Sequence, residues 1–264
     1  MYMLDHPGWD TADGTLIRAM RTLAGTWLIP AVGEAKLISG SGDAPPVDTY
    51  EPVALDLAAL PPGLAHALRT LGPVRRWRNT DLWDALATAI IRQVIRAGQA
   101  RKMHQVFRAV SGDKVAVTAL IPTPEQVLAM SAEKFADLGM AFKRRPLQAA
   151  AGAYLDHHAE WSQLPADVLV KALQAVPRIG PWTAGTAVAD HTGDFSVYPH
   201  ADLAVRTWAA TADPTTAWPA DEPGFTAVWQ RLAGPHLSTL TVLTLAWGDD
   251  HARKTPVDPG TQPR

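Results

Sequence analysis

Apolar residues beyond Thr80 recur mostly at steps of three and four positions, which predicts a largely helical chain. The clearest run follows Asp81, a residue suited to an N-cap, and consists of Leu82, Trp83, Leu86, Ala89, Ile90, Val94 and Ile95. Further helix starts are predicted by a capping box or by a well-placed cap or proline: Thr123-Pro124-Glu125-Gln126, Ser131, Pro146 before the Ala-rich run 147–158, and Pro165.

The first 72 residues follow a different pattern. Thr11 to Leu23 suits a short helix, and two short strand-like runs cover 26–32 and 47–55, separated by the turn-rich stretch 39–46. We therefore expect a small α+β segment over 1–72 and a helical domain over 73–264, which ends in a Pro- and Gly-rich tail from Pro256.

The stretch from Leu173 to Arg206 predicts a helix, a tight turn, a second helix, a loop and the start of a third helix. Pro177 and Gly180 bracket the turn, and Pro181 stands where the first residue of a helix belongs. Such a turn points backbone N–H groups outward beside a helix N-terminus, which is a site for an anion such as a phosphate. Asp202 follows at the expected start of the next helix, where the helix dipole favours a carboxylate.

Composition narrows the function classes. The absence of Cys among the 264 residues excludes both a disulfide framework and a four-cysteine iron–sulfur site. The net charge of −2 argues by itself against nucleic-acid binding, but residues 71–150 hold 13 Lys or Arg against 6 Asp or Glu. A basic surface is therefore expected in this third of the chain.

The hairpin stretch resembles the helix-hairpin-helix DNA glycosylases (HhH-GPD superfamily), most closely the 3-methyladenine DNA glycosylase II branch. Residues 176–184 (V-P-R-I-G-P-W-T-A) match the family pattern L-P-G-[IV]-G-x-x-T-A, with the hairpin over 173–189, and residues 202–206 (D-L-A-V-R) match its Asp segment. One departure is Arg178, where the family usually has Gly, a residue that relieves strained turns.

Two further segments resemble the same family. Residues 82–100 look like its helix-turn-helix opening, in which the turn Arg92-Gln93-Val94 would wedge into the base stack, and 138–144 matches the segment L-G-[LM]-x-x-x-[KR]. The match weakens near Ser238, where a basic residue is expected. The resemblance implies DNA contacts by Gln93, Val94, Arg178, Ile179, Gly180, Thr183, Lys143 and Arg144. Each basic residue among them could equally be a solvated surface residue.

The resemblance assigns catalysis to Asp202, whose carboxylate would support the sugar as it becomes cationic. The alternative is that Asp202 only caps its helix. Relatives that also cut the DNA backbone carry a Lys where this chain has Trp182, so the resemblance implies base excision without lyase activity. Trp182, Tyr198 and Trp208 are the expected base-pocket residues, although each could instead pack in the core.

The resemblance thus predicts a mainly helical, two-lobed glycosylase fold with a small N-terminal α+β segment. It predicts a monomeric enzyme of base excision repair that excises an alkylated base from duplex DNA. We expect no cofactor and no metal site, because His157 and His158 have no third ligand at metal spacing. Some relatives hold a monovalent cation on the hairpin carbonyls, which the resemblance allows here.

A cytoplasmic location without a membrane partner is expected, because Met1 to Asp10 lacks the features of a signal peptide. Two other functions stay open: a non-catalytic DNA-binding protein that keeps the hairpin for phosphate contact, and the same fold acting on a deaminated or oxidised base.

Overall fold

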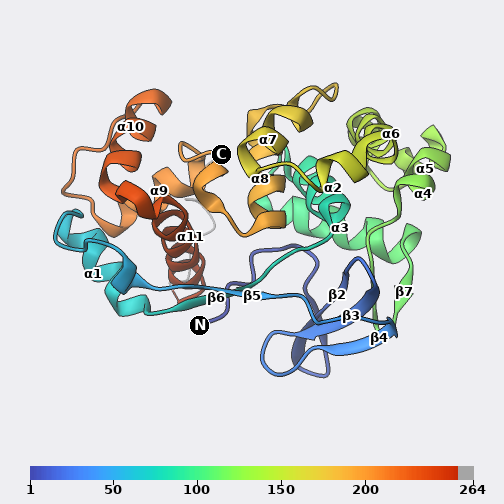
Figure 1. Cartoon of the computed structure of the whole chain (residues 1–264), viewed down its shortest axis with the longest axis horizontal. Coiled ribbons are helices and arrows are strands. Elements are labelled where there is room, and N and C mark those ends of the chain that lie inside the picture. The colour runs from blue at the N-terminus through green and yellow to red at the C-terminus, as the bar shows by residue number, and fades with distance from the viewer. Residues whose placement is uncertain (255–264) are drawn as a thin grey trace. The chain divides into compact units, whose positions relative to one another are not determined.

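The computed structural model describes residues 1–254, so the Pro- and Gly-rich tail expected from Pro256 lies outside the described residues. The described chain is mainly helical and carries an N-terminal antiparallel sheet of four strands, which confirms the predicted fold class (Figure 1). None of the described helices has the length and apolar character needed to cross a membrane.

Contacts divide the chain into two compact units, each built from separated stretches of sequence. We call residues 6–46 and 77–193 the hairpin unit, and residues 1–5, 47–76 and 194–254 the terminal unit. The expected division separates residues 1–72 from the rest of the chain. It does not coincide with this grouping, because segments from 1–72 contribute to both units.

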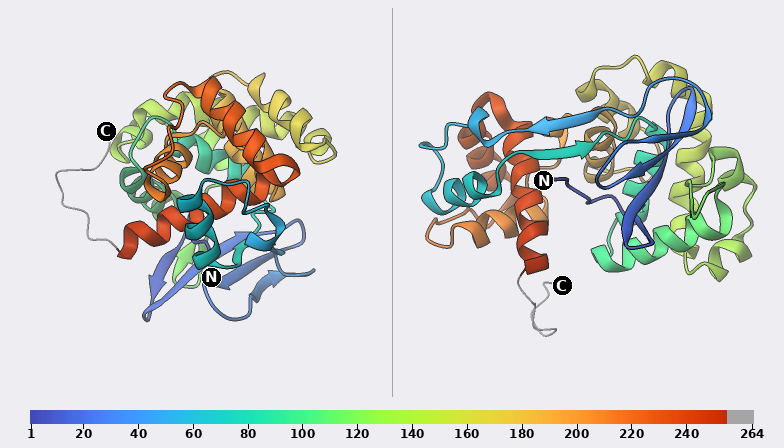
Figure 2. Two further views of the ribbon diagram at one scale, coloured as in Figure 1. Left: turned by 90° about the vertical axis from the view of Figure 1, so that its left-hand side faces the viewer. Right: turned by 90° about the horizontal axis from the view of Figure 1, so that it is seen from below.

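The hairpin unit contains the four-stranded sheet, drawn in blue in the two views of Figure 2. Its strands pair antiparallel in chain order: β1 (Asp10–Ala12), β2 (Thr15–Arg21), β3 (Gly25–Pro30) and β4 (Lys36–Gly40). The strand expected over 26–32 is confirmed as β3.

The helix predicted from Thr11 to Leu23 is wrong, because this segment forms β1 and β2. Asp13 and Gly14 have φ of 48° and 76°, the backbone of a tight hairpin turn that Asp-Gly adopts readily. Residues Ile17 to Met20 of β2 are all buried, so the strand lacks the alternation of a half-exposed strand. Its apolar spacing therefore imitates a helix.

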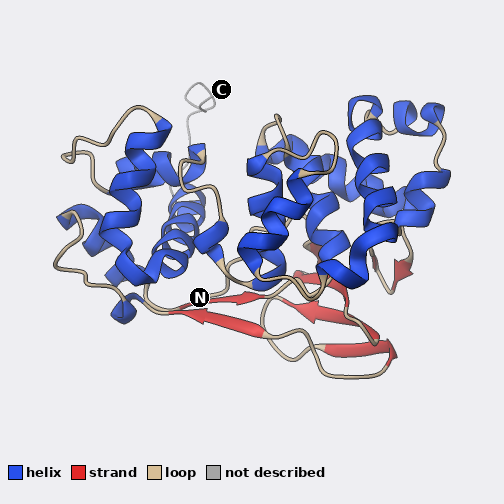
Figure 3. Ribbon diagram, turned by 45° about the horizontal axis from the view of Figure 1, so that its top comes forward, coloured by secondary structure: helices blue, strands red, loops and turns tan. Residues whose placement is uncertain are grey.

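The rest of the hairpin unit is mostly helical, as the blue ribbons of Figure 3 show. The elements are α2 (Leu82–Arg92), α3 (Ala97–Ser111), β7 (Lys114–Val115), β8 (Thr118–Ala119), α4 (Pro124–Ala129), α5 (Ala132–Asp137), the 3-10 turn η2 (Ala141–Lys143), α6 (Arg144–Trp161), α7 (Ala166–Gln174) and α8 (Pro181–Thr192).

Local sequence signals place several of these helix ends. The Asp81 carboxylate accepts from the backbone N–H groups of Trp83 and Asp84, at 2.9 and 3.2 Å. The capping box at Thr123 and the Ser131 cap also form as predicted, whereas α6 begins two residues before Pro146. Helix α2 then packs against α3, α6 and α8, and this contact buries the side chains of Trp83, Leu86 and Ile90.

The terminal unit is built around α11 (Leu237–Lys254), which packs against α1 (Pro62–Leu71), α9 (Leu203–Ala212) and α10 (Glu222–Ala233). Its remaining elements are β5 (Val47–Tyr50), which pairs with β6 (Val74–Trp77), and the 3-10 turns η1 (Pro52–Ala54), η3 (Phe195–Val197) and η4 (Gly234–His236). The core of this unit includes Leu64, Leu68, Phe225, Trp229 and Leu243.

Candidate functional site

The predicted hairpin forms between α7 and α8. Val176 and Ile179 turn into the core, while Pro177 and Arg178 are exposed. The backbone N–H of Ile179 donates to the carbonyl oxygen of Val176 over 3.1 Å, which closes the turn. Two buried apolar anchors thus hold an exposed tip, the arrangement expected of a turn that presents its backbone to a ligand.

Arg178, at the tip of this turn, has φ of 72°. Left-handed backbone costs an L-residue about 1–2 kcal/mol, a cost that Gly avoids. The family pattern has Gly at this position. The turn in this chain has the same left-handed backbone, and Arg178 therefore carries strain that Gly would avoid. An exposed guanidinium at this position adds a positive charge that suits a phosphate.

The N-terminus of α8 lies next to the tip. Gly180 is its N-cap, no side chain caps it, and Pro181 takes the first helical position as predicted. A Cβ built on Gly180 would meet nothing within 4 Å, so the space in front of this helix end is open. Backbone N–H groups that lack a side-chain cap, together with the positive end of the helix dipole, make it suitable for an anion.

The turn after α2, which we call the wedge turn (residues 92–94), projects its last side chain into solvent. Val94 has a relative exposure of 102% and φ of 60°, a conformation that a β-branched residue rarely adopts. An apolar side chain that is both fully exposed and held in strained backbone is suited to insertion between bases.

Gln93 of the wedge turn points back toward the hairpin. Its Nε2 donates to the Thr183 hydroxyl, and to the Arg178 carbonyl oxygen over 3.4 Å. The side chain therefore links the wedge turn to the hairpin tip, and Val94 is the residue left to protrude.

Lys143 supports the same turn from the other side. Its ammonium donates to the carbonyl oxygens of Ile90 and Gln93, at 2.8 and 2.6 Å, and the residue is only 2% exposed. Burial lowers the pKa of Lys143 to about 8. This corrects its expected role as a phosphate contact, because the ammonium instead satisfies carbonyls at the end of α2. Arg144 is half-buried at the start of α6.

Asp202 occupies the N-cap position of α9 in the terminal unit, yet its side chain makes no capping hydrogen bond. Its Oδ2 instead accepts a hydrogen bond from the Tyr198 hydroxyl over 2.9 Å, and its backbone N–H donates to the Pro199 carbonyl oxygen over 2.9 Å. The carboxylate is half-buried. The structure thus supports the helix-start position of Asp202 but gives its carboxylate a different contact from a cap.

The three aromatic residues expected in a base pocket lie in different surroundings. Trp182 is half-buried on the first turn of α8. Trp208 packs across α11, where a Cβ on Gly248 would come within 2.2 Å of its ring. Tyr198 is 5% exposed and stacks on Phe195, so its ring is covered and its hydroxyl is engaged by Asp202. The pocket roles of Trp182 and Trp208 stay predictions.

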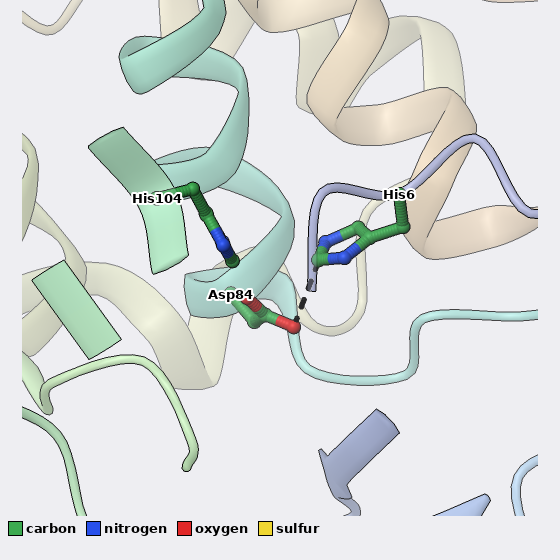
Figure 4. A group of neighbouring side chains, drawn as sticks. All are labelled: His6, Asp84 and His104. Atoms are coloured by element: carbon green, nitrogen blue, oxygen red, sulfur yellow. Dashed lines mark ion pairs between the residues drawn. The ribbon is translucent and has the colours of Figure 1, made fainter. Parts of the chain in front are cut away.

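Sequence reasoning missed a buried cluster in the hairpin unit, formed by His6, Asp84 and His104 (Figure 4). Their ligand-type atoms lie within 4.8 Å of one another, and His6 Nε2 is 3.9 Å from Asp84 Oδ2. Arg18 also donates to that oxygen over 2.8 Å. A divalent cation would face this guanidinium, so we interpret the cluster as a network that joins β2 to α2 and α3.

Desolvation and nearby arginines, Arg108 first among them, hold the pKa of His104 well below its usual value. Its Nε2 is 3.0 Å from the Thr88 hydroxyl, which in turn donates to Asp84. The cluster therefore combines the neutral imidazole of His104 with an Asp84 carboxylate that pairs with the Arg18 guanidinium. Residues so far apart in the sequence gave no local signal.

No family model and no curated protein sequence matches this chain. Among solved structures, the 3-methyladenine DNA glycosylase from Archaeoglobus fulgidus is similar with a TM-score of 0.70 and 16% identity, over 93% of this chain and 91% of its own.

Two other similar structures are glycosylases in complex with DNA. An 8-oxoguanine glycosylase/lyase from Clostridium acetobutylicum, in complex with duplex DNA, has a TM-score of 0.68 and 15% identity over 95% of this chain and 89% of its own. The 3-methyladenine DNA glycosylase Mag1 of Schizosaccharomyces pombe, in complex with abasic DNA, has a TM-score of 0.56 and 18% identity, over 68% of this chain and 85% of its own. The chain therefore has the fold of the helix-hairpin-helix DNA glycosylases.

Proposed function

We propose that this protein is a DNA glycosylase that removes a damaged base from duplex DNA in base excision repair. Its substrate would be an alkylated base, and it would leave the abasic strand uncut. The observation that carries the proposal is the state of Asp202: a carboxylate at a helix start that does not cap the helix and is positioned by a tyrosine hydroxyl.

The hairpin unit supplies the DNA contacts in this proposal. Phosphates would bind at the open N-terminus of α8 and beside the exposed Arg178. Val94 would enter the base stack once the damaged nucleotide has rotated out, and its protrusion in strained backbone supports this role. None of these contacts requires a particular base, so binding would depend on salt more than on sequence.

Asp202 would carry the chemistry. Departure of the base leaves positive charge on the sugar, and a nearby carboxylate stabilises that charge without forming a bond. Water then attacks the sugar, and the products are the free base and an abasic site. A protein that only binds DNA has no use for such a carboxylate, so the non-catalytic DNA-binding alternative is less favoured.

Trp182 supports the absence of lyase activity, because an indole cannot form a Schiff base with the sugar. Its π face also suits an electron-poor alkylated base, and such cation–π attraction contributes about 0.5–2 kcal/mol. Borohydride reduction during turnover should therefore yield no covalent protein–DNA adduct. A trapped adduct would show that another amine attacks the sugar.

An oxidised or deaminated base is the alternative substrate, and the similarity to an 8-oxoguanine glycosylase/lyase favours testing it. The protein should be incubated with methylated duplex DNA and, separately, with duplexes that contain 8-oxoguanine or uracil. Mass spectrometry of the released bases identifies the substrate. Release of a methylated purine supports the proposal, release of only another base changes the substrate, and no release from any duplex overturns it.

A further inference from the structure

The hydroxyl of Tyr198 lies 2.9 Å from Asp202 Oδ2 and donates to it. The backbone around this pair is short and fixed: Tyr198 ends the turn η3, its N–H donates to the Phe195 carbonyl oxygen over 3.3 Å, and Asp202 N–H donates to Pro199 over 2.9 Å. The two side chains therefore meet across one tight loop that both residues help to close.

An aromatic and ionic framework holds the Tyr198 ring. The ring stacks on Phe195 with centroids 5.7 Å apart, and the guanidinium of Arg76 lies 5.1 Å from the Phe195 centroid. Arg76 also donates two hydrogen bonds to the Asp5 carboxylate. Tyr50 packs edge-on against the same Phe195 at 6.3 Å. These contacts leave the Tyr198 hydroxyl little freedom to move.

The framework is also tied to the central helix of the terminal unit. The backbone N–H of Phe195 donates to the Ser238 hydroxyl of α11 over 2.9 Å, and the Asp194 carboxylate caps η3 by accepting from the Ser196 N–H over 2.9 Å. A rigid support of this kind is what a functional carboxylate requires, because its distance to the reacting atom must stay within a fraction of an ångström.

We propose that Tyr198 is a positioning residue for Asp202. The ordinary partners of an aspartate at an N-cap are the first backbone N–H groups of its helix, and the Asp202 carboxylate makes no such bond to α9. The phenol hydrogen bond holds it away from that position and directed for catalysis. The inference rests on the proposed function, and it replaces the expectation that Tyr198 lines the base pocket.

The test is Tyr198→Phe, which removes one oxygen and keeps the stacked ring. A hydrogen bond to a charged group of this kind corresponds to about a tenfold change in rate. We expect the single-turnover excision rate at saturating enzyme to fall about tenfold, with unchanged melting temperature and unchanged affinity for DNA containing an abasic site. Tyr154→Phe is the matched control, because that half-buried ring packs on Trp83 in the other unit and its variant should excise at the wild-type rate.

A double-mutant cycle separates positioning from a general structural effect. If Tyr198 acts through the charge on Asp202, Tyr198→Phe should slow excision about tenfold in the wild type and hardly at all in Asp202→Asn. An equal loss in both backgrounds, a loss confined to DNA affinity, or a wild-type rate for Tyr198→Phe would each overturn the inference.

A spectroscopic measurement keeps this inference distinct from the proposed function. The chain has four Tyr, so 13Cζ-labelled tyrosine gives four signals, and Tyr198→Phe assigns one of them. Asp202→Asn should shift the Tyr198 signal and leave the other three in place. An unmoved signal overturns the inference even if the enzyme is active, whereas a shifted signal in a protein that releases no base supports the contact and rejects only the function.

Discussion

Arg178 offers a test in which stability and DNA binding should respond in different ways. Its φ of 72° strains the folded state, and its exposed guanidinium is the proposed phosphate contact. Arg178→Ala removes the charge and keeps the strain, while Arg178→Gly removes both. Relief of left-handed strain is worth about 1–2 kcal/mol, offset by about 0.5–1 kcal/mol for the greater freedom of Gly in the unfolded chain.

We therefore expect Arg178→Gly to be more stable than Arg178→Ala by about 0.5–1 kcal/mol, which in a chain of this size raises the melting temperature by about 1–4 °C. Both variants should bind duplex DNA equally weakly. The slope of log affinity against log salt should fall by about 0.9 relative to wild type, which corresponds to one lost phosphate contact.

Calorimetry and binding titrations at four salt concentrations measure both effects on the same preparations. Wild-type affinity and salt slope in the two variants would remove Arg178 from the DNA interface. A Gly variant less stable than the Ala variant would refute the assignment of strain to this residue.

The remaining predictions concern the N-terminus of α8 and pH. Gly180→Glu should weaken binding to all duplexes alike, and more than Gly180→Gln does, because both side chains enter the open space in front of α8 but only the charge of Glu repels phosphate; equal effects of the two variants would refute this. Burial depresses the pKa of His104 in the folded state, so below pH 6.5 the unfolded chain binds a proton that the folded chain does not. As pH falls below 6.5, the free energy of unfolding should decrease by up to about 1.4 kcal/mol per pH unit more in the wild type than in His104→Gln, measured by urea unfolding. Identical pH dependence of the free energy of unfolding in the two proteins would refute this role of His104.

The parts of the fold that the sequence predicted correctly depend on local chemistry. Pro177, Gly180 and Pro181 define the hairpin within a few residues, and Asp81 and Thr123 cap their helices with neighbouring N–H groups. Each signal acts over one turn of chain, so it can be recognised without knowledge of the tertiary structure.

The errors arise where tertiary contacts decide. The strand β2 is buried at four successive positions, so its apolar spacing resembles that of a helix. Lys143 was expected to be exposed, as most lysines are, but it reaches carbonyls at the end of a helix some fifty residues earlier. The bond between Tyr198 and Asp202 spans only four residues, yet it depends on the direction in which a non-helical loop turns.

Asp202→Asn tests the central claim most directly. The amide preserves the shape of the side chain and caps a helix about as well as Asp does, but it lacks the negative charge. The single-turnover rate of base excision should fall on the order of 100-fold or more, while the melting temperature and the affinity for abasic DNA stay close to those of the wild type. A variant that excises at the wild-type rate would contradict the proposed role of Asp202 in catalysis.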